Sequence, residues 1–317
     1  MNKIAIVNTY HGRFRDDIGF WFKSIEFNPT IDFFLFTDLS VPVSLSNLKV
    51  IKMSFDELVA ITQKNFDFKI VCDRPQKHPD YRPAFGEIFK DYLKNYDFWG
   101  HSEQDLFYGD IRAFITDDIL DKYDRILGNG HLTLYRNTPE VNSEYKKVKR
   151  PYYKVVYSHN RNFFFEEGGG TRPYWINERP SKYFYRPFFD DINIYNDHFM
   201  TYHETVDKHI QKHFIYSFEQ GKAFRYYEDN GLVKKVETLY VHYQKRNLEV
   251  RCEPQNRFMV IPNAIIPFQE NVTVDFLRKY AYHRCKYFHS RFYIQWWQRA
   301  KVKWVWIKNP IDLENIE

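Results

Sequence analysis

The sequence predicts an α/β fold with a parallel sheet, because strand-like and helix-like segments alternate from the N-terminus. Three short segments are apolar and rich in β-branched or aromatic residues, as buried strands are, namely 4–8, 31–38 and 48–53. A helix-like run through Trp21 and Ile25 separates the first two. After the third, Ser54 and Glu57 have the spacing of a capping box, which predicts a helix over 54–62. This order of elements is typical of α/β domains.

The rest of the chain predicts shorter elements and one irregular region. The expected helices are 85–94 and 111–121, and the expected strands are 96–99 and 132–135. Asp229-Asn230-Gly231 lies between the strand-like segments 224–227 and 239–244, which indicates a β-hairpin. Residues 145–196 mix aromatic and polar side chains around a triple glycine and are interpreted as irregular. We expect one domain over 1–270 and an extension over 271–317.

Composition favours a folded protein. Hydrophobic residues make up 44% of the 317, which excludes wholesale disorder. The net charge of +5 permits anionic partners without selecting one. The three cysteines are far apart, so they form neither a disulfide framework nor a metal-ligand pair and fit a reducing compartment. No secretory signal or membrane-spanning stretch is recognisable, so we expect a cytoplasmic protein, soluble or peripheral on the membrane.

The most informative segment is Asp97 to Asp105, in which an apolar strand leads into two carboxylates. On an extended backbone, residues at positions i and i+2 share a face, so Glu103 and Asp105 are expected to converge on one cation. Carboxylates and phosphate oxygens are the ligands of hard divalent ions such as Mg²⁺, which hold diphosphates. The alternative is a solvated acidic turn.

Polar residues also follow the first two predicted strands. Thr9 and Tyr10 come directly after the first, and Asp38 ends the second. Ligands of open α/β sheets bind beyond the carboxyl ends of the strands. These three residues are therefore candidates for cofactor binding.

Two basic segments are candidates for phosphate contacts. His242 ends an apolar strand and is followed by Lys245 and Arg246, so the segment offers a metal-binding nitrogen and two cations. The alternative is a core histidine followed by a basic surface turn. Arg82 precedes a predicted helix with Pro83 at an early position, which suits either a phosphate clamp or an ordinary helix start.

Taken together, these segments resemble a family of bacterial capsular and exopolysaccharide glycosyltransferases, formerly grouped as a domain of unknown function. Six ordered segments carry the resemblance, over about residues 1–265, namely 10–12, 28–38, 80–86, 98–110, 130–137 and 242–246. The chain departs from the family pattern at Glu103 and Glu166, where the family has Asp. Both changes keep the charge and lengthen the side chain.

The resemblance implies a GT-A-type, Rossmann-like nucleotide-sugar domain with a mixed central sheet. It implies Mn²⁺ or Mg²⁺ on Asp105 and His242, with Glu103 binding the cation, directly or through water, or the ribose. The donor is expected to be a nucleotide-sugar, first of all a UDP-sugar, with Lys245 or Arg246 near its phosphates. Glu166 and Glu167, beside a triple glycine, are the candidates for a catalytic base, and the alternative is a solvated acidic turn.

The C-terminal extension is basic and aromatic. Residues 278–308 contain nine Lys or Arg and no Asp or Glu. The same segment also contains Trp296, Trp297 and Trp304. We expect a helical tail that lies on an anionic membrane surface. Packing back on the domain is the main alternative. Binding of single-stranded nucleic acid is another, although no nucleic-acid-binding motif accompanies the tail.

The functional hypothesis is transfer of a sugar from a nucleotide-diphosphate donor to a growing surface polysaccharide. The acceptor is expected to be a glycan linked to undecaprenyl, at the inner face of the plasma membrane. No nucleic-acid partner is expected. The alternative is a non-catalytic carbohydrate-binding or scaffold protein of the same pathway, in which Glu103 marks the loss of the metal site.

Overall fold

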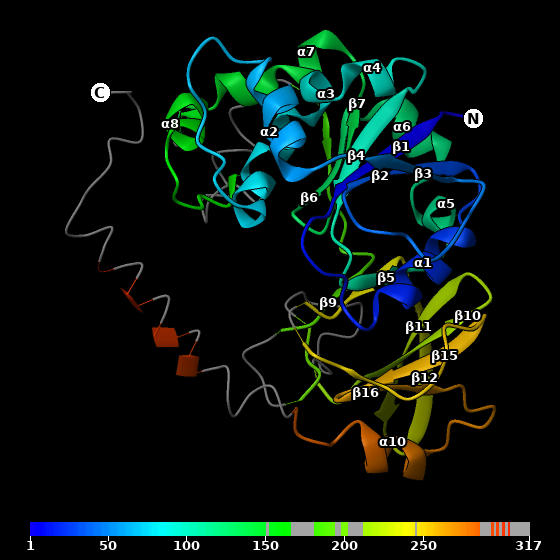
Figure 1. Cartoon of the computed structure of the whole chain (residues 1–317). Helices are drawn as coiled ribbons and strands as arrows, with labels where there is room; N and C mark the ends of the chain where they lie inside the picture. Colours follow the sequence, from blue (N-terminus) through cyan, green and yellow to red (C-terminus); the bar gives the residue numbers. More distant parts are fainter. Residues whose placement is uncertain are drawn as a thin grey trace.

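The structure is a computed structural model of the chain (Figure 1). It describes residues 1–149, 152–165, 181–193, 198–201, 212–244 and 246–285, and single positions between 293 and 304. Glu166, Glu167 and Lys245 therefore lie outside the described residues. Within the described part, the chain is a mixed α/β protein with two large sheets and one small sheet.

The first sheet has the strand order β3-β2-β1-β4-β7-β6-β8 within the described residues. Its strands are β1 (Ile4–Thr9), β2 (Ile31–Thr37), β3 (Leu48–Lys52), β4 (Phe98–Ser102), β6 (Arg125–Asn129), β7 (Leu132–Arg136) and β8 (Tyr183–Phe184). The first four strands in this order are parallel to one another, and β7 is antiparallel to β4 and β6. The predicted N-terminal strands and their parallel pairing are thus confirmed, and the sheet is mixed.

Helices cover both faces of this sheet (Figure 1). They are α1 (Ile18–Glu26), α2 (Phe55–Gln63), α3 (Phe85–Ile88), α4 (Lys90–Leu93), α5 (Ile111–Phe114), α6 (Asp117–Lys122), α7 (Pro139–Asn142) and α8 (Tyr153–Ser158), with 3₁₀ helices over Pro75–Ala84 (η1) and Glu144–Lys147 (η2). Alternate residues of β1 separate two apolar cores, since Ala5 and Val7 belong to one and Ile4 and Ile6 to the other. The capping box of Ser54 and Glu57 is confirmed at the start of α2.

The second sheet is mainly antiparallel and has the order β12-β11-β10-β15-β16-β14 among the described residues. Its strands are β10 (Ile215–Glu219), β11 (Lys222–Asp229), β12 (Leu232–Thr238), β14 (Glu249–Val250), β15 (Arg257–Ile261) and β16 (Ala264–Pro267). The predicted hairpin is confirmed at Asn230-Gly231, where φ is 50° and 76°. Its second strand is β12, because a two-residue turn leads directly into 232–238.

A small sheet, β5-β13-β9, lies between the two large ones (Figure 1). Its strands are β5 (Leu106–Tyr108), β13 (Tyr240–His242) and β9 (Asp190–Asp191). Gly109, directly after β5, permits a close approach to the second sheet, because a Cβ there would lie 2.8 Å from the backbone of Ala223 and of Thr238. The segment 239–244, expected to close the hairpin, instead supplies the middle strand of this sheet.

Helix α1 packs between the two large sheets. The ring centroids of Phe20 and Phe258, in the second sheet, lie 4.7 Å apart. Those of Trp21 and Phe33, in the first sheet, lie 6.3 Å apart. Phe20 and Trp21 are both fully buried. Each buried aromatic ring contributes about 2 kcal/mol or more to folding, so neighbouring residues of the helix stabilise its packing on both sheets.

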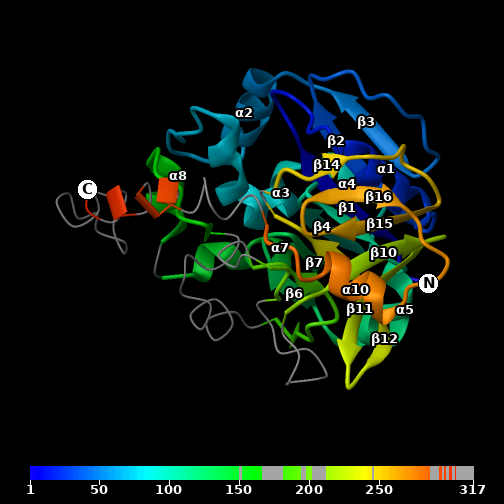
Figure 2. The same ribbon diagram turned by 90° about the horizontal axis from the view of Figure 1, so that it is seen from below.

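The C-terminal extension begins with a packed helix, α10 (Val274–Tyr280), against β11 (Figure 2). Leu277 and Ala281 are buried there, and Arg278 pairs with Glu228 of β11. Beyond residue 285 only single positions are described, and the expected helical tail lies mostly outside them. Among the described residues, no helix combines the length and the apolar character needed to cross a bilayer.

Candidate metal centre

Two carboxylates and one imidazole converge where the first sheet meets the small sheet. His242 Nε2 lies 3.1 Å from Glu103 Oε2 and 3.2 Å from Asp105 Oδ1. One ligand atom from each residue lies within 4.8 Å of the other two, a spacing that a single cation can span. The structure thus brings together the three residues that the sequence singled out as metal ligands.

The strand pairing explains this convergence. Glu103 directly follows β4, and Asp105 directly precedes β5. β5 pairs antiparallel with β13, so that Leu106 lies opposite His242, and the Tyr243 amide donates a hydrogen bond to the Asp105 carbonyl at 3.1 Å. The pairing of β5 with β13 therefore holds Asp105 and His242 next to each other.

The two carboxylates converge from a bend and not from the extended backbone that the sequence suggested. The Gln104 side chain between them donates to Asn8 Oδ1 at 2.9 Å, and the Ser102 hydroxyl donates to the same oxygen at 2.7 Å. Asn8 is buried near the end of β1. Its carboxamide oxygen therefore holds the bend on the first sheet while Glu103 and Asp105 both reach His242.

The opposite side of the His242 ring faces Asp191 of β9. His242 Nδ1 lies 2.9 Å from Asp191 Oδ1, which also accepts a hydrogen bond from Gln244 Nε2 at 2.7 Å. The His131 ring stacks on the His242 ring with centroids 4.5 Å apart, and its Nε2 lies 3.6 Å from Asp191 Oδ2. His131, Asp191 and His242 form a second, buried group with metal-ligand spacing.

Neighbouring charges shift the pKa values of His242 and Glu103 more than burial does. Burial alone lowers the pKa of His242, but the nearby carboxylates Asp105, Asp191 and Glu103 raise this pKa well above its ordinary value. Burial alone raises the pKa of Glu103, but the contacts with His242 and Arg82 lower it. Without a cation the cluster therefore holds an imidazolium among carboxylates, and a divalent cation would replace its proton.

The donor set fits a divalent cation. His242 Nε2 is buried and has no hydrogen-bond partner among the described residues, although two carboxylate oxygens lie within 3.2 Å of it. Such an imidazole nitrogen accepts a cation once its proton leaves. A mixed set of carboxylate oxygens and one imidazole nitrogen suits first-row divalent ions such as Mn²⁺ better than Mg²⁺, which prefers oxygen and water.

Arg82 is part of the cluster in a way that differs from expectation. It lies inside the 3₁₀ helix η1, which runs directly into α3, so there is no free helix N-terminus for it to precede. Its guanidinium donates to Glu103 Oε1 at 3.2 Å and to the Gly130 carbonyl at 3.0 Å. Arg82 therefore fixes the rotamer and the charge of Glu103.

Three further candidates, Thr9, Tyr10 and Asp38, lie at the ends of β1 and β2. Thr9 ends β1, Tyr10 follows it and Asp38 follows β2. Because these strands are parallel to β4, the three residues lie at the same sheet edge as Glu103. The Thr9 hydroxyl lies 3.2 Å from His78 Nδ1, and the Tyr10 hydroxyl donates to a carbonyl of the following loop at 3.1 Å. Asp38 is exposed.

Arg246 is buried, with 1% of its surface exposed, although the sequence suggested a phosphate contact. Its guanidinium donates to the carbonyls of Ile192 at 3.3 Å and Asn193 at 2.6 Å and stacks on the Phe199 ring at 5.5 Å. These contacts anchor the segment after β9. In the structure Arg246 therefore has a structural role, and its guanidinium is occupied by backbone carbonyls.

Sequence reasoning missed Asp191, which lies in a two-residue strand within the region interpreted as irregular. His131 lies inside the segment 130–137 that carried the family resemblance, but no role was assigned to it. The adjacent acids Asp190 and Asp191 were the available signal. Only the pairing of β9 with β13 shows that one of them faces His242.

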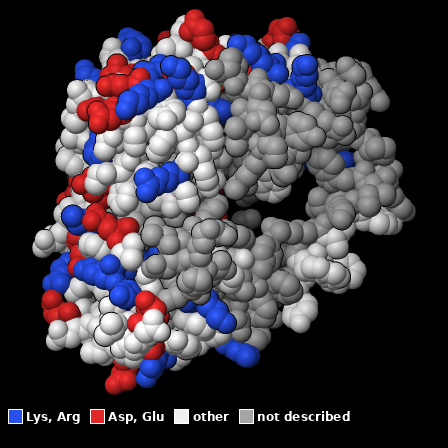
Figure 3. All heavy atoms as spheres, turned by 180° about the vertical axis from the view of Figure 1, so that it is seen from behind, with Lys and Arg blue, Asp and Glu red and all other residues white. Residues whose placement is uncertain are grey.

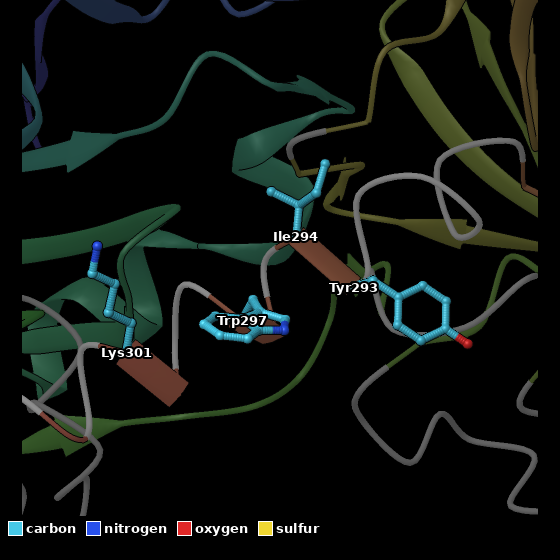
Figure 4. A pocket seen from close by; sticks show the side chains of 4 residues that line it. All are labelled: Tyr293, Ile294, Trp297 and Lys301. Atoms are coloured by element: carbon cyan, nitrogen blue, oxygen red, sulfur yellow. The ribbon is translucent and has the colours of Figure 1, made fainter.

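A shallow depression of about 320 Å³ lies apart from this cluster, on the C-terminal segment. Tyr293, Ile294, Trp297 and Lys301 line it, and none of the metal-centre residues takes part (Figure 4). Over the described part of the face in Figure 3, basic and acidic side chains are interspersed. The described part of that face therefore shows no patch of a single sign of charge.

Residues 6–269 match the profile of a family described as a family of unknown function, DUF6625. The chain belongs to DUF6625. The DUF6625 match includes every residue of the candidate metal centre described above. No curated protein gives a significant match.

Among solved structures, this DUF6625 chain is similar to the crystal structure of the glycosyltransferase GlyE in Streptococcus pneumoniae TIGR4. The identity is 13% and the TM-score is 0.27. The alignment covers 43% of this chain and 35% of the other, so it spans about a third of that protein. At this level of similarity the match indicates nothing about the activity of this chain.

Proposed function

We propose that this protein is a metal-dependent glycosyltransferase that takes a sugar from a nucleotide-diphosphate donor. The observation that carries the proposal is the convergence of Glu103, Asp105 and His242 at the carboxyl edge of the parallel strands. Ligands of open α/β sheets bind at this edge. A run of parallel strands that continues into an antiparallel strand, with an acidic motif after β4, also agrees with a GT-A-type fold.

In this proposal Asp105 and His242 hold the cation, and Glu103 is its third ligand or a ribose contact. The cation would offset the charge that develops on the departing nucleotide diphosphate. Arg82 keeps the Glu103 carboxylate ionised and in place through its 3.2 Å contact. Because both carboxylates are held by fixed neighbours, the site is ordered before the donor arrives, which lowers the cost of reorganisation.

The nucleoside is proposed to lie along Thr9, Tyr10 and Asp38, at the same edge of the sheet as the metal centre. A UDP-sugar is the proposed donor. Lys245 is the proposed phosphate contact, since Arg246 is occupied by backbone carbonyls. Glu166 or Glu167 is the proposed base for the acceptor hydroxyl if the anomeric centre is inverted.

The acceptor is proposed to be a lipid-linked glycan of the cell surface, reached at the inner face of the plasma membrane. Four side chains of the C-terminal segment support a membrane contact, because Tyr293, Trp296, Trp297 and Trp304 are each more than half exposed. Exposed tryptophans next to Lys301 are typical of segments that lie on an anionic bilayer surface.

Donor turnover tests the proposal. Purified protein is incubated with UDP-, GDP-, CMP- and TDP-sugars, with and without Mn²⁺, and released nucleotide is measured. We expect Mn²⁺-dependent hydrolysis or transfer with at least one donor. Asp118→Asn, a change at an exposed acid of α6, is the matched control for Asp105→Asn. Absence of turnover, together with binding of glycan alone, would favour the non-catalytic alternative.

A further inference from the structure

We infer that Asp191 is a positioning residue that fixes the ring and the tautomer of His242, so that Nε2 is the nitrogen presented to the cation. This inference rests on the proposed metal-dependent function and deepens it. The observation behind it is a hydrogen bond of 2.9 Å between His242 Nδ1 and Asp191 Oδ1, on the side of the ring opposite Glu103 and Asp105.

The hydrogen-bonding capacity of the groups decides on which side the cation binds. Two overlapping groups have metal-ligand spacing, and both contain His242. A neutral imidazole has one N–H and one lone pair, and an ionised carboxylate can only accept. Nδ1 makes a hydrogen bond with Asp191, whereas Nε2 has no hydrogen-bond partner among the described residues, so in a neutral His242 the N–H is placed on Nδ1 and the lone pair on Nε2. The cation then lies with Glu103 and Asp105, and not between His131 and Asp191.

Asp191 is itself held on several sides. β9 pairs in parallel with β13 so that Asp191 lies opposite His242, and the Ile192 amide donates to the His242 carbonyl at 2.9 Å. Gln244 Nε2 donates to Asp191 Oδ1 at 2.7 Å. The side chain is 10% exposed. A carboxylate fixed in this way leaves the imidazole one orientation, as in the carboxylate–histidine–metal arrangements of many metalloproteins.

His131 covers one face of the His242 ring. The two rings stack at 4.5 Å with an interplanar angle of 30°, and His131 Nδ1 lies 2.6 Å from the Tyr240 hydroxyl. His131 Nε2, 3.6 Å from Asp191, is too far for a hydrogen bond. The stacked ring hinders rotation of His242, while Asp191 alone selects its tautomer. Tyr240 therefore belongs to the packing around the site.

The test compares the affinity of the full-length protein for Mn²⁺ in three variants, measured by the electron paramagnetic resonance of free Mn²⁺. Asp191→Asn keeps the shape but can donate to Nδ1, which places the N–H on Nε2 and blocks the ligand nitrogen. Asp191→Ala removes the acceptor altogether. Loss of an outer carboxylate typically weakens metal binding about 10- to 100-fold, and we expect this loss in both variants. Tyr240→Phe, the isosteric control, should change the affinity by less than about 3-fold, because the phenol does not touch His242.

A spectroscopic readout separates positioning from general loss of structure. The ¹⁵N shifts of the His242 ring, recorded with bound Cd²⁺, should show a protonated Nδ1 and a metal-bound Nε2 in the wild type. Circular dichroism of each variant shows whether it is folded. Equal Mn²⁺ affinity of wild type and Asp191→Asn, or a wild-type ring protonated on Nε2, overturns the inference and leaves the proposed function standing. A wild type that binds no Mn²⁺ overturns both.

Discussion

His242 Nε2 lies 3.2 Å from Asp105 Oδ1, although the two residues are far apart in the sequence. The antiparallel pairing of β5 with β13 produces this proximity. Asp105→Asn keeps the size of the side chain but removes its charge. We expect it to abolish Mn²⁺-dependent donor turnover while the circular dichroism spectrum stays that of a folded protein. Activity retained in this variant would remove Asp105 from the metal site.

The pair Lys77 and Asp80 is predicted to be the most sensitive charged contact for stability. Their side chains are 0% and 3% exposed and their charged atoms are 2.8 Å apart. Asp80 also accepts hydrogen bonds from the amides of Phe163 and Phe165. Asp80→Asn leaves the Lys77 ammonium buried without its counter-charge, which costs about 3–5 kcal/mol in chemical unfolding.

The double variant Lys77→Met, Asp80→Asn is the control for that change. It removes the buried charge as well as its partner, so it should regain a large part of the lost stability. A single variant as stable as the wild type would show that the ion pair is not needed to hold residues 163–165.

The acid stability of the protein is predicted to depend on His78. Burial, with the charges of His11 and Arg82, lowers the pKa of His78 to about 3 in the folded protein. In the unfolded chain the pKa is about 6.5, so the unfolded state binds the proton first as the pH falls. The contribution of neutral His78 is therefore complete above pH 6.5 and is lost progressively between about pH 6.5 and 3, by up to about 1.4 kcal/mol per pH unit.

His78→Gln removes this titration. Its unfolding free energy should fall less steeply than that of the wild type between pH 7 and 5, as measured by urea denaturation at each pH. Identical slopes for the two proteins would mean that His78 is not held neutral by the fold.

The C-terminal segment is predicted to bind anionic vesicles. A chain that ends at residue 285 keeps α10 and the buried Leu277 and Cys285, so it should fold. The full chain should co-sediment with phosphatidylserine vesicles at low salt and less at high salt, because screening weakens the contribution of about 1 kcal/mol from each basic residue. Equal sedimentation of both proteins would exclude the segment as the membrane contact.

The sequence predicted the cluster of Glu103, Asp105 and His242 better than its surroundings. Asp105 and His242 could be found because each lies beside an apolar strand, and strand ends are visible in the pattern. Asp191 could not, since its strand is two residues long and is defined only by pairing with β13. Arg246 was expected to contact phosphate because it follows His242 at a strand end, but its burial depends on carbonyls that only the folded chain brings near.

The fold shows the same contrast. The parallel strands β1 and β2 carry long apolar runs, and β3 has three apolar residues in five, so local pattern was sufficient. β6 was missed because Arg125 and Gly128 interrupt its apolar residues. The position of 239–244 depended on the length of one turn, which local apolar content does not reveal.

The most direct measurement of the central claim is thermal melting with Mn²⁺ and UDP together. A ligand at about 100 times its dissociation constant stabilises the folded state by about 2.7 kcal/mol, which raises the melting temperature of a chain this size by several degrees. We predict that rise for the wild type with both ligands, a smaller one with UDP alone, and none from Mn²⁺ in Asp105→Asn. A wild-type melting temperature that does not change when Mn²⁺ is added, or an equal rise in Asp105→Asn, would contradict the assignment of a nucleotide-diphosphate metal site.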